Sequence, residues 1–318
     1  MLELLRLGTR GSKLALAQSH WVADALRAAH PELDVEIQVI QTRGDATQAA
    51  NIPLASLGDK GIFAKELEAA LLAGEIDLAV HSMKDLEHTL PEGLVIAAVP
   101  KREDPRDALV GSTLDALPPG ARVGTGSVRR RALLLSRRPD LQLLEIRGNV
   151  DTRLRKFREG QYDAICLAVA GLNRLGLQDN ITEILDPEWF TPDPGQGAVA
   201  VETRLGDRRV RDYLLPIDDP VSSATTGVER AFLRAMGGGC KTPLGALSVW
   251  GDIRPASWGM AASLDGTTIL RSYYSPDFVP EPLEEQGQAL ARSLQLQGAA
   301  ELLGFGTEAP RVETRGSE

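Results

Sequence analysis

Short apolar runs typical of strands alternate with amphipathic runs typical of helices, and two breaker-rich segments interrupt this pattern, at residues 100–107 and 191–195. Such alternation is typical of an α/β fold built on a mostly parallel sheet. The two breaker-rich segments flank one complete α/β unit. We therefore expect the chain to leave a first lobe, build a second lobe and return, so that the paired crossings form a hinge beside a ligand cleft.

Beyond Asp218 the alternation stops. A long amphipathic helix is predicted over residues 220–236, a hairpin around Asp265 and Gly266, and a last helix over residues 283–303. This pattern indicates a small α+β C-terminal domain. The predicted division is lobe one at residues 1–99 and 197–217, lobe two at residues 100–196 as an insertion with an arginine-rich cleft wall, and the third domain at residues 218–318.

The charge of the chain is unevenly distributed. The formal net charge is −9, which argues against non-specific binding to nucleic acid. Residues 121–160 nevertheless hold eleven Arg and Lys against four Asp and Glu, a local balance of +7 in which Arg outnumbers Lys ten to one. Arginine favours planar recognition of carboxylate or phosphate. The segment therefore predicts an anion site, although a solvated helix face would also account for a single charged run.

Cysteine, histidine and apolar content exclude several classes of protein. Two cysteines in 318 residues cannot form a disulfide framework, which favours a cytoplasmic location. Charged residues interrupt every apolar run, so we expect no membrane span, and the first residues do not resemble a signal peptide. None of the four histidines has metal-ligand spacing, so no metal is expected.

Cys240 is the first candidate for chemistry. It follows three glycines and precedes Lys241, and a nearby ammonium group favours the nucleophilic thiolate. Cys166, in contrast, lies in an apolar run and is expected to be a small buried side chain. From the pattern alone, a functional Cys240 and an inert loop thiol stay equally open. A nucleotide phosphate loop is rejected, because that motif requires glycine at the position of Cys240.

The segment from His81 to Asp85 follows the C-terminal end of an apolar strand, where ligands bind in open α/β sheets. Lys84 could neutralise an anionic group. Asp85 could accept hydrogen bonds from ring N–H groups and stabilise developing positive charge. A simple ion pair in a loop is the alternative interpretation.

Three strand-to-helix turns carry arginine. They lie at residues 10–12, 124–131 and 147–153. Backbone N–H groups and the helix dipole at such turns bind anions. We therefore expect an anion-filled cleft, which phosphate would fit as well as carboxylate.

An ordered set of motifs resembles the porphobilinogen deaminase family. The match runs from about residue 4 to residue 250, in the order typical of the family. The motifs are residues 9–12 (TRGS), 42–45 (TRGD), 58–61 (GDKG), 65–68 (KELE), 81–85 (HSMKD), 102–107 (REDPRD), 147–150 (RGNV), 168–172 (AVAGL), 195–198 (GQGA) and 238–240 (GGC).

The resemblance implies a fold, a cofactor and an activity. The fold has two lobes like those of periplasmic binding proteins and a third domain. Cys240 would hold a dipyrromethane cofactor through a thioether. The expected enzyme is a monomeric transferase that joins four porphobilinogen molecules on this primer, releasing ammonia and hydroxymethylbilane for tetrapyrrole biosynthesis.

The resemblance also assigns site residues, with Asp85 as the catalytic carboxylate. The implied cofactor-binding residues are Ser82, Lys84, Asp85, Thr125, Ser127, Arg129, Arg130 and Arg153. The implied substrate-binding residues are Arg10, Ser12, Gln18, Lys60, Phe63, Arg147, Arg174 and Gln196.

Three positions depart from the pattern of the family. Residues 86–88 read Leu-Glu-His instead of beginning Val-Pro, Gly126 replaces a frequent Ser, and Gly237 replaces a frequent Glu. The main rival interpretation is a non-catalytic bilobal protein that binds a small anion. That rival explains a hinge and a basic cleft, but not a glycine-flanked cysteine in a third domain.

Overall fold

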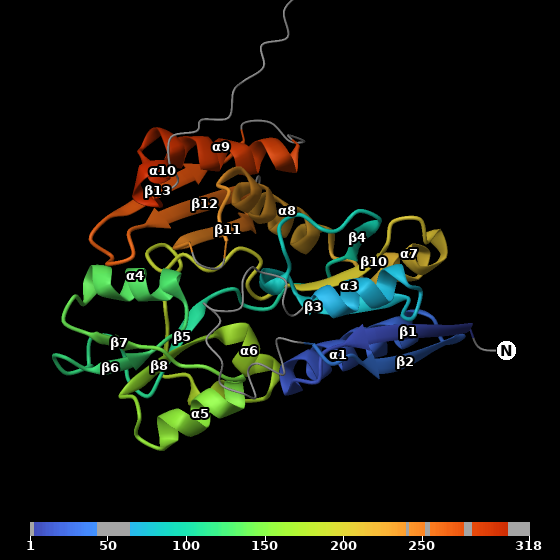
Figure 1. Ribbon diagram of the computed structural model, residues 1–318, viewed down its shortest axis with the longest axis horizontal. Helices are drawn as coiled ribbons and strands as arrows, with labels where there is room; N and C mark the ends of the chain where they lie inside the picture. The colour runs from blue at the N-terminus through green and yellow to red at the C-terminus, as the bar shows by residue number, and fades with distance from the viewer. Residues whose placement is uncertain (1–2, 43–63, 240–241, 252–254, 277–281, 305–318) are drawn as a thin grey trace, which may run out of the picture.

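The structure is a computed structural model that describes residues 3–42, 64–239, 242–251, 255–276 and 282–304. Within these residues the strands form two five-stranded sheets and one three-stranded sheet. Figure 1 shows the two larger sheets side by side, with the three-stranded sheet and its helices lying across them. The prediction of two α/β lobes and a small α+β domain is confirmed.

The sheet of lobe one has the strand order β2-β1-β3-β10-β4. β1 pairs in parallel with β2 and β3, whereas β10 is antiparallel to β3 and β4. Its apolar core packs α1 and α7 against the strands through residues such as Leu5, Leu26 and Val201. The elements of this lobe are β1 (Glu3–Thr9), α1 (Lys13–Ala29), β2 (Leu33–Val39), α3 (Lys65–Leu72), β3 (Leu78–Ser82), β4 (Leu94–Ala98), β10 (Val199–Arg204) and α7 (Arg208–Leu214).

The sheet of lobe two has the order β7-β6-β8-β5-β9. β6 pairs in parallel with β7 and β8, and β5 is antiparallel to β8 and β9. The elements are β5 (Asp107–Val110), β6 (Arg122–Gly124), α4 (Val128–Arg137), β7 (Gln142–Leu144), α5 (Val150–Arg158), β8 (Ala164–Ala168), α6 (Val169–Arg174) and β9 (Glu183–Ile184).

The antiparallel strands correct the expectation of mostly parallel sheets. β10 follows the second crossing and enters its sheet beside the end of β3, with Val199 opposite Ser82. β5 follows the first crossing and likewise starts beside the end of β8, with Asp107 opposite Ala168. A strand that enters at the carboxyl end of its neighbour must run in the opposite direction. The two crossings therefore impose the mixed topology.

The N-termini of α1 and α4 are fixed by serine caps. The Ser12 hydroxyl accepts a hydrogen bond from the Ala15 backbone N–H at 3.2 Å. The Ser127 hydroxyl accepts one from the Arg130 backbone N–H at 3.4 Å. Such caps satisfy N–H groups that lack a partner within the helix. Both helices consequently begin where the arginine-bearing turns end.

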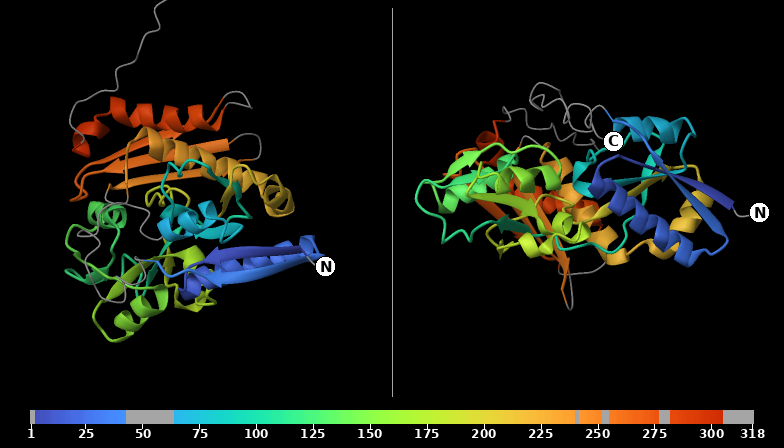
Figure 2. Two further views of the ribbon diagram at one scale, coloured as in Figure 1. Left: turned by 45° about the vertical axis from the view of Figure 1, so that its right-hand side comes forward. Right: turned by 90° about the horizontal axis from the view of Figure 1, so that it is seen from below.

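The third domain packs α8 (Pro220–Ala235) and α9 (Leu283–Leu296) on the antiparallel strands β11 (Leu244–Trp250), β12 (Pro255–Ala262) and β13 (Ile269–Tyr274). Gly287 lets the two helices approach, since a Cβ there would lie 2.5 Å from the Phe232 backbone nitrogen. The last helix was predicted as continuous, but Gly298, with φ of +91°, separates α9 from α10 (Ala299–Leu302). Figure 2 shows this domain lying across both lobes.

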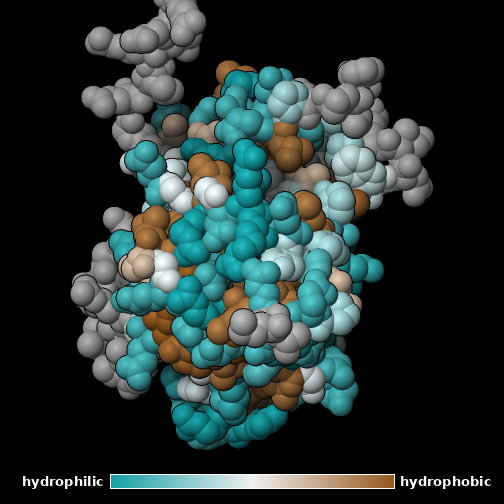
Figure 3. Space-filling model, turned by 90° about the vertical axis from the view of Figure 1, so that its right-hand side faces the viewer, coloured by the Kyte–Doolittle hydropathy of each residue, from teal (hydrophilic) through white to brown (hydrophobic). Residues whose placement is uncertain are grey.

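Hydrophilic residues cover most of the face at the right-hand side of Figure 1, with hydrophobic ones in smaller patches (Figure 3). None of the helices in the described part of the chain combines the length and the apolar character needed to cross a bilayer.

Candidate active site

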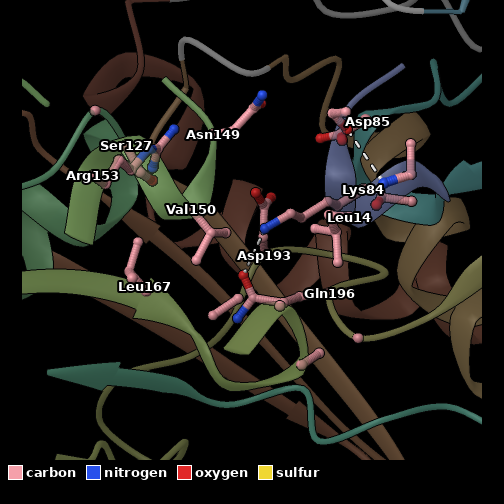
Figure 4. Close-up of a pocket in the computed structure, with 18 of the residues that line it drawn as sticks. Leu14, Lys84, Asp85, Ser127, Asn149, Val150, Arg153, Leu167, Asp193 and Gln196 are labelled. Atoms are coloured by element: carbon pink, nitrogen blue, oxygen red, sulfur yellow. Dashed lines mark hydrogen bonds between the residues drawn. The ribbon is translucent and has the colours of Figure 1, made fainter. Parts of the chain in front are cut away.

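A cavity of about 660 Å³ lies where the two lobes and the third domain meet. Asp85 lines it from lobe one, Ser127 and Arg153 line it from lobe two, and Gly239 and Thr242 line it from the third domain. Figure 4 shows Lys84 and Asp85 on one side of this space, with Ser127 and Arg153 across from them. The predicted cleft between lobes is therefore present.

Asp85 is carried by a single 3₁₀ turn, Met83–Asp85, directly after β3. The Met83 backbone N–H donates to the Ala198 carbonyl at 3.0 Å, and the Leu86 N–H donates to the Met83 carbonyl at 3.2 Å. Before the turn, the Ser82 hydroxyl and the Gln18 side chain form hydrogen bonds of 3.0 and 3.2 Å with each other. These bonds fix the backbone on both sides of Asp85, whose carboxylate faces the cavity.

The ammonium group of Lys84 turns toward Gln196 of the second crossing and donates to its Oε1 at 3.2 Å (Figure 4). Burial lowers the pKa of Lys84, and the nearby charge of Arg130 lowers it further, whereas Asp85, Asp193 and Asp107 oppose this shift. A cation with a lowered pKa gains free energy when an anion approaches. Lys84 is therefore suited to hold a carboxylate in the cavity.

Arg129 and Arg130 are buried and share one carboxylate. Arg129 Nη1 and Arg130 Nη2 lie 2.9 and 2.7 Å from the oxygens of Asp107, which is fully buried. Burial alone would raise the pKa of Asp107, but the two guanidinium groups hold it below its usual value. The sequence assigned Asp107 to a polar linker; it is in fact the first residue of β5 and the counter-ion of this pair.

Arg153 and Arg174 are further cations on the cavity wall, and both are partly buried. Arg153 Nε donates to the Gly148 carbonyl at 2.8 Å, and Arg174 Nη2 donates to the Gly197 carbonyl at 2.7 Å. Burial lowers the pKa of each to about 10, and the charge of Arg130 contributes for Arg153. Both hydrogen bonds go to neutral carbonyls. The charges of Asp85 near Arg153 and of Glu103 near Arg174 offset part of the effect of burial, and an anionic ligand would stabilise both cations further.

The wall as a whole is cationic. Among the described residues that line the cavity, eight are Arg or Lys and four are Asp or Glu. These residues leave a formal excess of four positive charges. The carboxylate of Asp107, which lies behind the wall, lowers this excess to three. A formal excess of three positive charges around an enclosed space is unfavourable without anions. The residues present thus fit a polycarboxylate group such as dipyrromethane.

Only some of the arginines of residues 121–160 line the cavity. This corrects the expectation that the whole +7 segment contributes positive charge to the cleft. Arg129, Arg130, Arg147 and Arg153 line the cavity. The others bind elsewhere in the protein: Arg122 with Asp163, Arg131 with Leu143, Arg137 over the Trp189 ring, Arg138 with Asp140, Arg155 with Glu159 and Arg158 with Asn180.

The structure brings together most of the residues that the sequence singled out. Thr125 lies behind the wall, where its hydroxyl accepts from the Ser127 N–H at 3.2 Å. Lys60, Phe63 and Cys240 lie outside the described residues. The predicted residues that line the cavity are Arg10, Ser12, Gln18, Ser82, Lys84, Asp85, Ser127, Arg129, Arg130, Arg147, Arg153, Arg174 and Gln196.

The residues next to Cys240 also contribute to the cavity. Gly239 N–H donates to the Thr242 hydroxyl at 2.5 Å, and the Thr242 N–H donates to the Gly239 carbonyl at 2.9 Å. Gly237, a departure from the family pattern, has φ of +61°, which favours glycine. The chain on both sides of Cys240 is therefore part of the wall that faces Asp85.

Three acidic residues of the cavity were missed. Asp193, Glu145 and Asp151 all line it. Asp193 stands between two prolines and was assigned to a linker, and Glu145 lies beside the predicted Arg147 turn, with which it forms an ion pair. An acid flanked by prolines at a crossing is a weak signal, but it could have indicated a hinge residue.

Comparisons with known proteins agree with this geometry. The family model described as "Porphobilinogen deaminase, dipyromethane cofactor binding domain" matches residues 5–212, and "Porphobilinogen deaminase, C-terminal domain" matches residues 224–295. The chain belongs to the porphobilinogen deaminase family. The predicted family is confirmed, and so is a dipyrromethane cofactor as the group that its larger domain binds.

Curated porphobilinogen deaminases match nearly the whole chain. The protein from Roseiflexus castenholzii is 52% identical over 308 residues, covering 95% of this chain and 99% of its own. That from Deinococcus radiodurans is 45% identical over 306 residues, covering 95% and 98%. Among solved structures, the methionine binding protein MetQ aligns with a TM-score of 0.44 at 13% identity, covering 68% of this chain and 91% of that chain.

Proposed function

We propose that this protein is a hydroxymethylbilane synthase, a transferase that joins four porphobilinogen molecules and releases ammonia. The observation that carries the proposal is the net positive charge of the cavity wall around Asp85. Porphobilinogen bears an acetate and a propionate, so each added ring brings two negative charges. A cavity with a formal excess of positive charge, lined from three domains, suits such a growing polyanion.

The cofactor, when bound, supplies an anchored pyrrole chain whose terminal ring provides the attacking carbon. We assign its attachment to Cys240. Ser82, Lys84, Thr125, Ser127, Arg129, Arg130 and Arg153 are proposed to hold it, with Thr125 acting through Ser127 and Arg130 acting while paired with Asp107. Lys84 and Arg153 face the cavity from opposite sides (Figure 4), which allows carboxylates on both edges of a flat chain to be bound.

Asp85 is proposed to stabilise positive charge on the substrate. When ammonia leaves the aminomethyl group of porphobilinogen, the remaining ring system is a cation. A carboxylate held on a rigid turn lowers the energy of that cation because it needs no reorganisation as charge develops. The same oxygens can accept hydrogen bonds from pyrrole N–H groups, and this orients the two rings for carbon–carbon bond formation.

Substrate carboxylates are proposed to bind a second group of side chains. Arg10 and Ser12 approach from the start of α1, and Arg174 approaches from the end of α6. The proposed group is Arg10, Ser12, Gln18, Lys60, Phe63, Arg147, Arg174 and Gln196. We also propose the domain boundaries predicted from the sequence, a monomer and a cytoplasmic location.

The Asp85→Asn variant tests this proposal. An amide has the same shape as the carboxylate but cannot balance a cation, so we expect porphobilinogen turnover to fall at least about 100-fold. The measurement is the rate of porphobilinogen consumption by protein whose thermal stability matches wild type. The control is Asp163→Asn, which removes a carboxylate paired with Arg122 outside the cavity wall. A near-normal rate in Asp85→Asn, or no turnover by wild type, would contradict the proposal.

A further inference from the structure

Helix α8 reaches across the domain boundary to the segment that follows Asp85. Arg230 Nη2 donates to the backbone carbonyls of Glu87 at 2.8 Å and His88 at 3.2 Å. One turn later, Arg234 Nη1 donates to the His88 carbonyl at 3.2 Å. Both acceptors lie in the stretch where this chain departs from the pattern of its family.

These bonds complete the support of the catalytic turn. The Ala198 carbonyl holds the turn at Met83, and the Leu86 N–H closes it. Leu86 is 2% exposed, so it also anchors the turn by burial. Arg230 then fixes the next two peptide units. The turn that presents Asp85 is therefore held at its start by lobe one and at its end by the third domain.

Arg230 is largely buried, which is energetically unfavourable for a charged group. Only 9% of the residue is exposed. Burial lowers its pKa to about 10, the like charge of Arg234 acts in the same direction, and Glu202 opposes them. Glu202 is itself fully buried and lies 3.1 Å from His81 Nε2. A buried guanidinium whose short contacts are main-chain carbonyls constrains backbone position more than a surface ion pair does.

The same helix leads toward the cysteine and holds the hinge. Leu233 lines the cavity, and the helix ends at Ala235, only a few residues before Cys240. At its middle, the Glu229 carboxylate accepts hydrogen bonds from Arg102 of the first crossing at 2.7 and 3.0 Å and from the Gly195 N–H of the second crossing at 2.6 Å. One helix thus contacts the hinge and the Asp85 segment, and the chain continues from its end to Cys240.

We propose that Arg230 is a positioning residue that fixes the Asp85 turn relative to the cysteine loop at the end of the same helix. The proposal rests on the proposed function, in which the chain tethered at Cys240 must be presented to Asp85. A displacement of about 1 Å in such an arrangement can reduce turnover by about 100-fold. Substrate affinity should change little, because the proposed substrate arginines lie on other elements.

The test is steady-state kinetics of Arg230→Met and Arg230→Lys, each purified with its primer confirmed by intact mass. Methionine keeps the apolar stem and removes every donor. We expect kcat to fall roughly 10- to 100-fold in Arg230→Met with KM for porphobilinogen unchanged. Lysine can still donate to one carbonyl, so Arg230→Lys should recover part of the lost kcat.

The matched control is Arg204→Met. Arg204 also donates to two main-chain carbonyls, those of Leu71 and Ile76 at 2.7 Å each, in the α3–β3 connection of lobe one and outside the cavity lining, and it pairs in addition with Asp77 and Asp207. We expect this variant to lose stability and keep wild-type kcat. If Arg230→Met does not fold, the test uses Arg230→Lys by itself. This variant should have a lower kcat than wild type, and the backbone amides of residues 86–90 should exchange hydrogen faster than they do in wild type.

Three outcomes would overturn the positioning role. They are wild-type kcat in the folded Arg230 variants, a rise in KM without loss of kcat, and an equal loss of kcat in Arg204→Met. Failure of the proposed function would look different, because wild-type protein itself would then carry no primer or consume no porphobilinogen.

Discussion

The third domain contacts the two lobes through interfaces of opposite character. Toward the sheet of lobe two the interface has an apolar core, in which Met260 and Ala262 of β12 pack with Leu133 and Phe190, and Arg271 adds hydrogen bonds to lobe two. Toward the two crossings and lobe one it is polar and directional: Glu229 binds Arg102 and Gly195 of the crossings, and Arg230 binds the lobe-one carbonyls after Asp85. The apolar cores of lobe one contain no third-domain residue within the described part of the chain.

This difference divides the cavity wall into two parts. A continuous apolar core holds its elements together without requiring a particular geometry. Lobe two and the third domain therefore present Ser127, Arg153, Gly239 and Thr242 together. The position of Asp85 in lobe one relative to the third domain depends on a few hydrogen bonds, which form only in a particular geometry. We expect changes in the apolar interface to alter stability but not turnover. Changes in the polar interface should alter both stability and turnover.

Breaking the polar interface at its most buried point should have the largest effect. Glu229→Ala removes the acceptor of Arg102 and of the Gly195 and Ser248 N–H groups. A buried ion pair with one partner removed loses about 3–5 kcal/mol, so we expect the free energy of unfolding to fall by about 4 kcal/mol. Equilibrium denaturant unfolding measures this, and kcat of the folded fraction should fall as well.

The double variant Arg102→Met with Glu229→Met is the control for that prediction. It replaces both charges by apolar groups, which often recovers much of the loss because no uncompensated charge stays buried. A loss below about 1 kcal/mol in Glu229→Ala would show that the polar contact contributes little, and the comparison would not hold.

A cavity in the apolar interface should have a smaller effect of a different kind. Met260 is fully buried in the core shared with lobe two. We expect Met260→Ala to reduce the free energy of unfolding by about 3 kcal/mol through lost burial and an unfilled cavity. Turnover of the folded protein should stay at the wild-type value. A fall in kcat comparable with that of Glu229→Ala would mean that both interfaces position the site.

Local signals in the sequence predicted much of the fold. The strand-to-helix turns at residues 10–12 and 124–131 were expected, and α1 and α4 begin there, because serine caps and apolar spacing depend only on neighbouring residues. The two crossings were found from proline and glycine. The direction of β5 and β10 was not, because it depends on which end of a sheet a crossing enters. The break at Gly298 has no comparable signal, since single glycines also occur within helices.

The candidate site was predicted from motifs, but its charge pairing was not. The turns holding Asp85, Ser127 and Arg147 line one cavity as expected. Asp107 is distant in sequence from the arginines it pairs with, so nothing local distinguishes it from a linker acid. The same holds for Glu229 and Arg102, which lie 127 residues apart. Side-chain pairing across domains follows from tertiary structure, and a single sequence carries little information about it.

The central claim is that one thiol tethers an anionic primer in the cavity that Asp85 faces, and intact-protein mass spectrometry tests it most directly. Wild-type protein produced where porphobilinogen is available should be heavier than its sequence by one dipyrromethane unit, and Cys240→Ala should have its sequence mass. Wild type at its sequence mass, or the added mass still present on Cys240→Ala, would contradict the account.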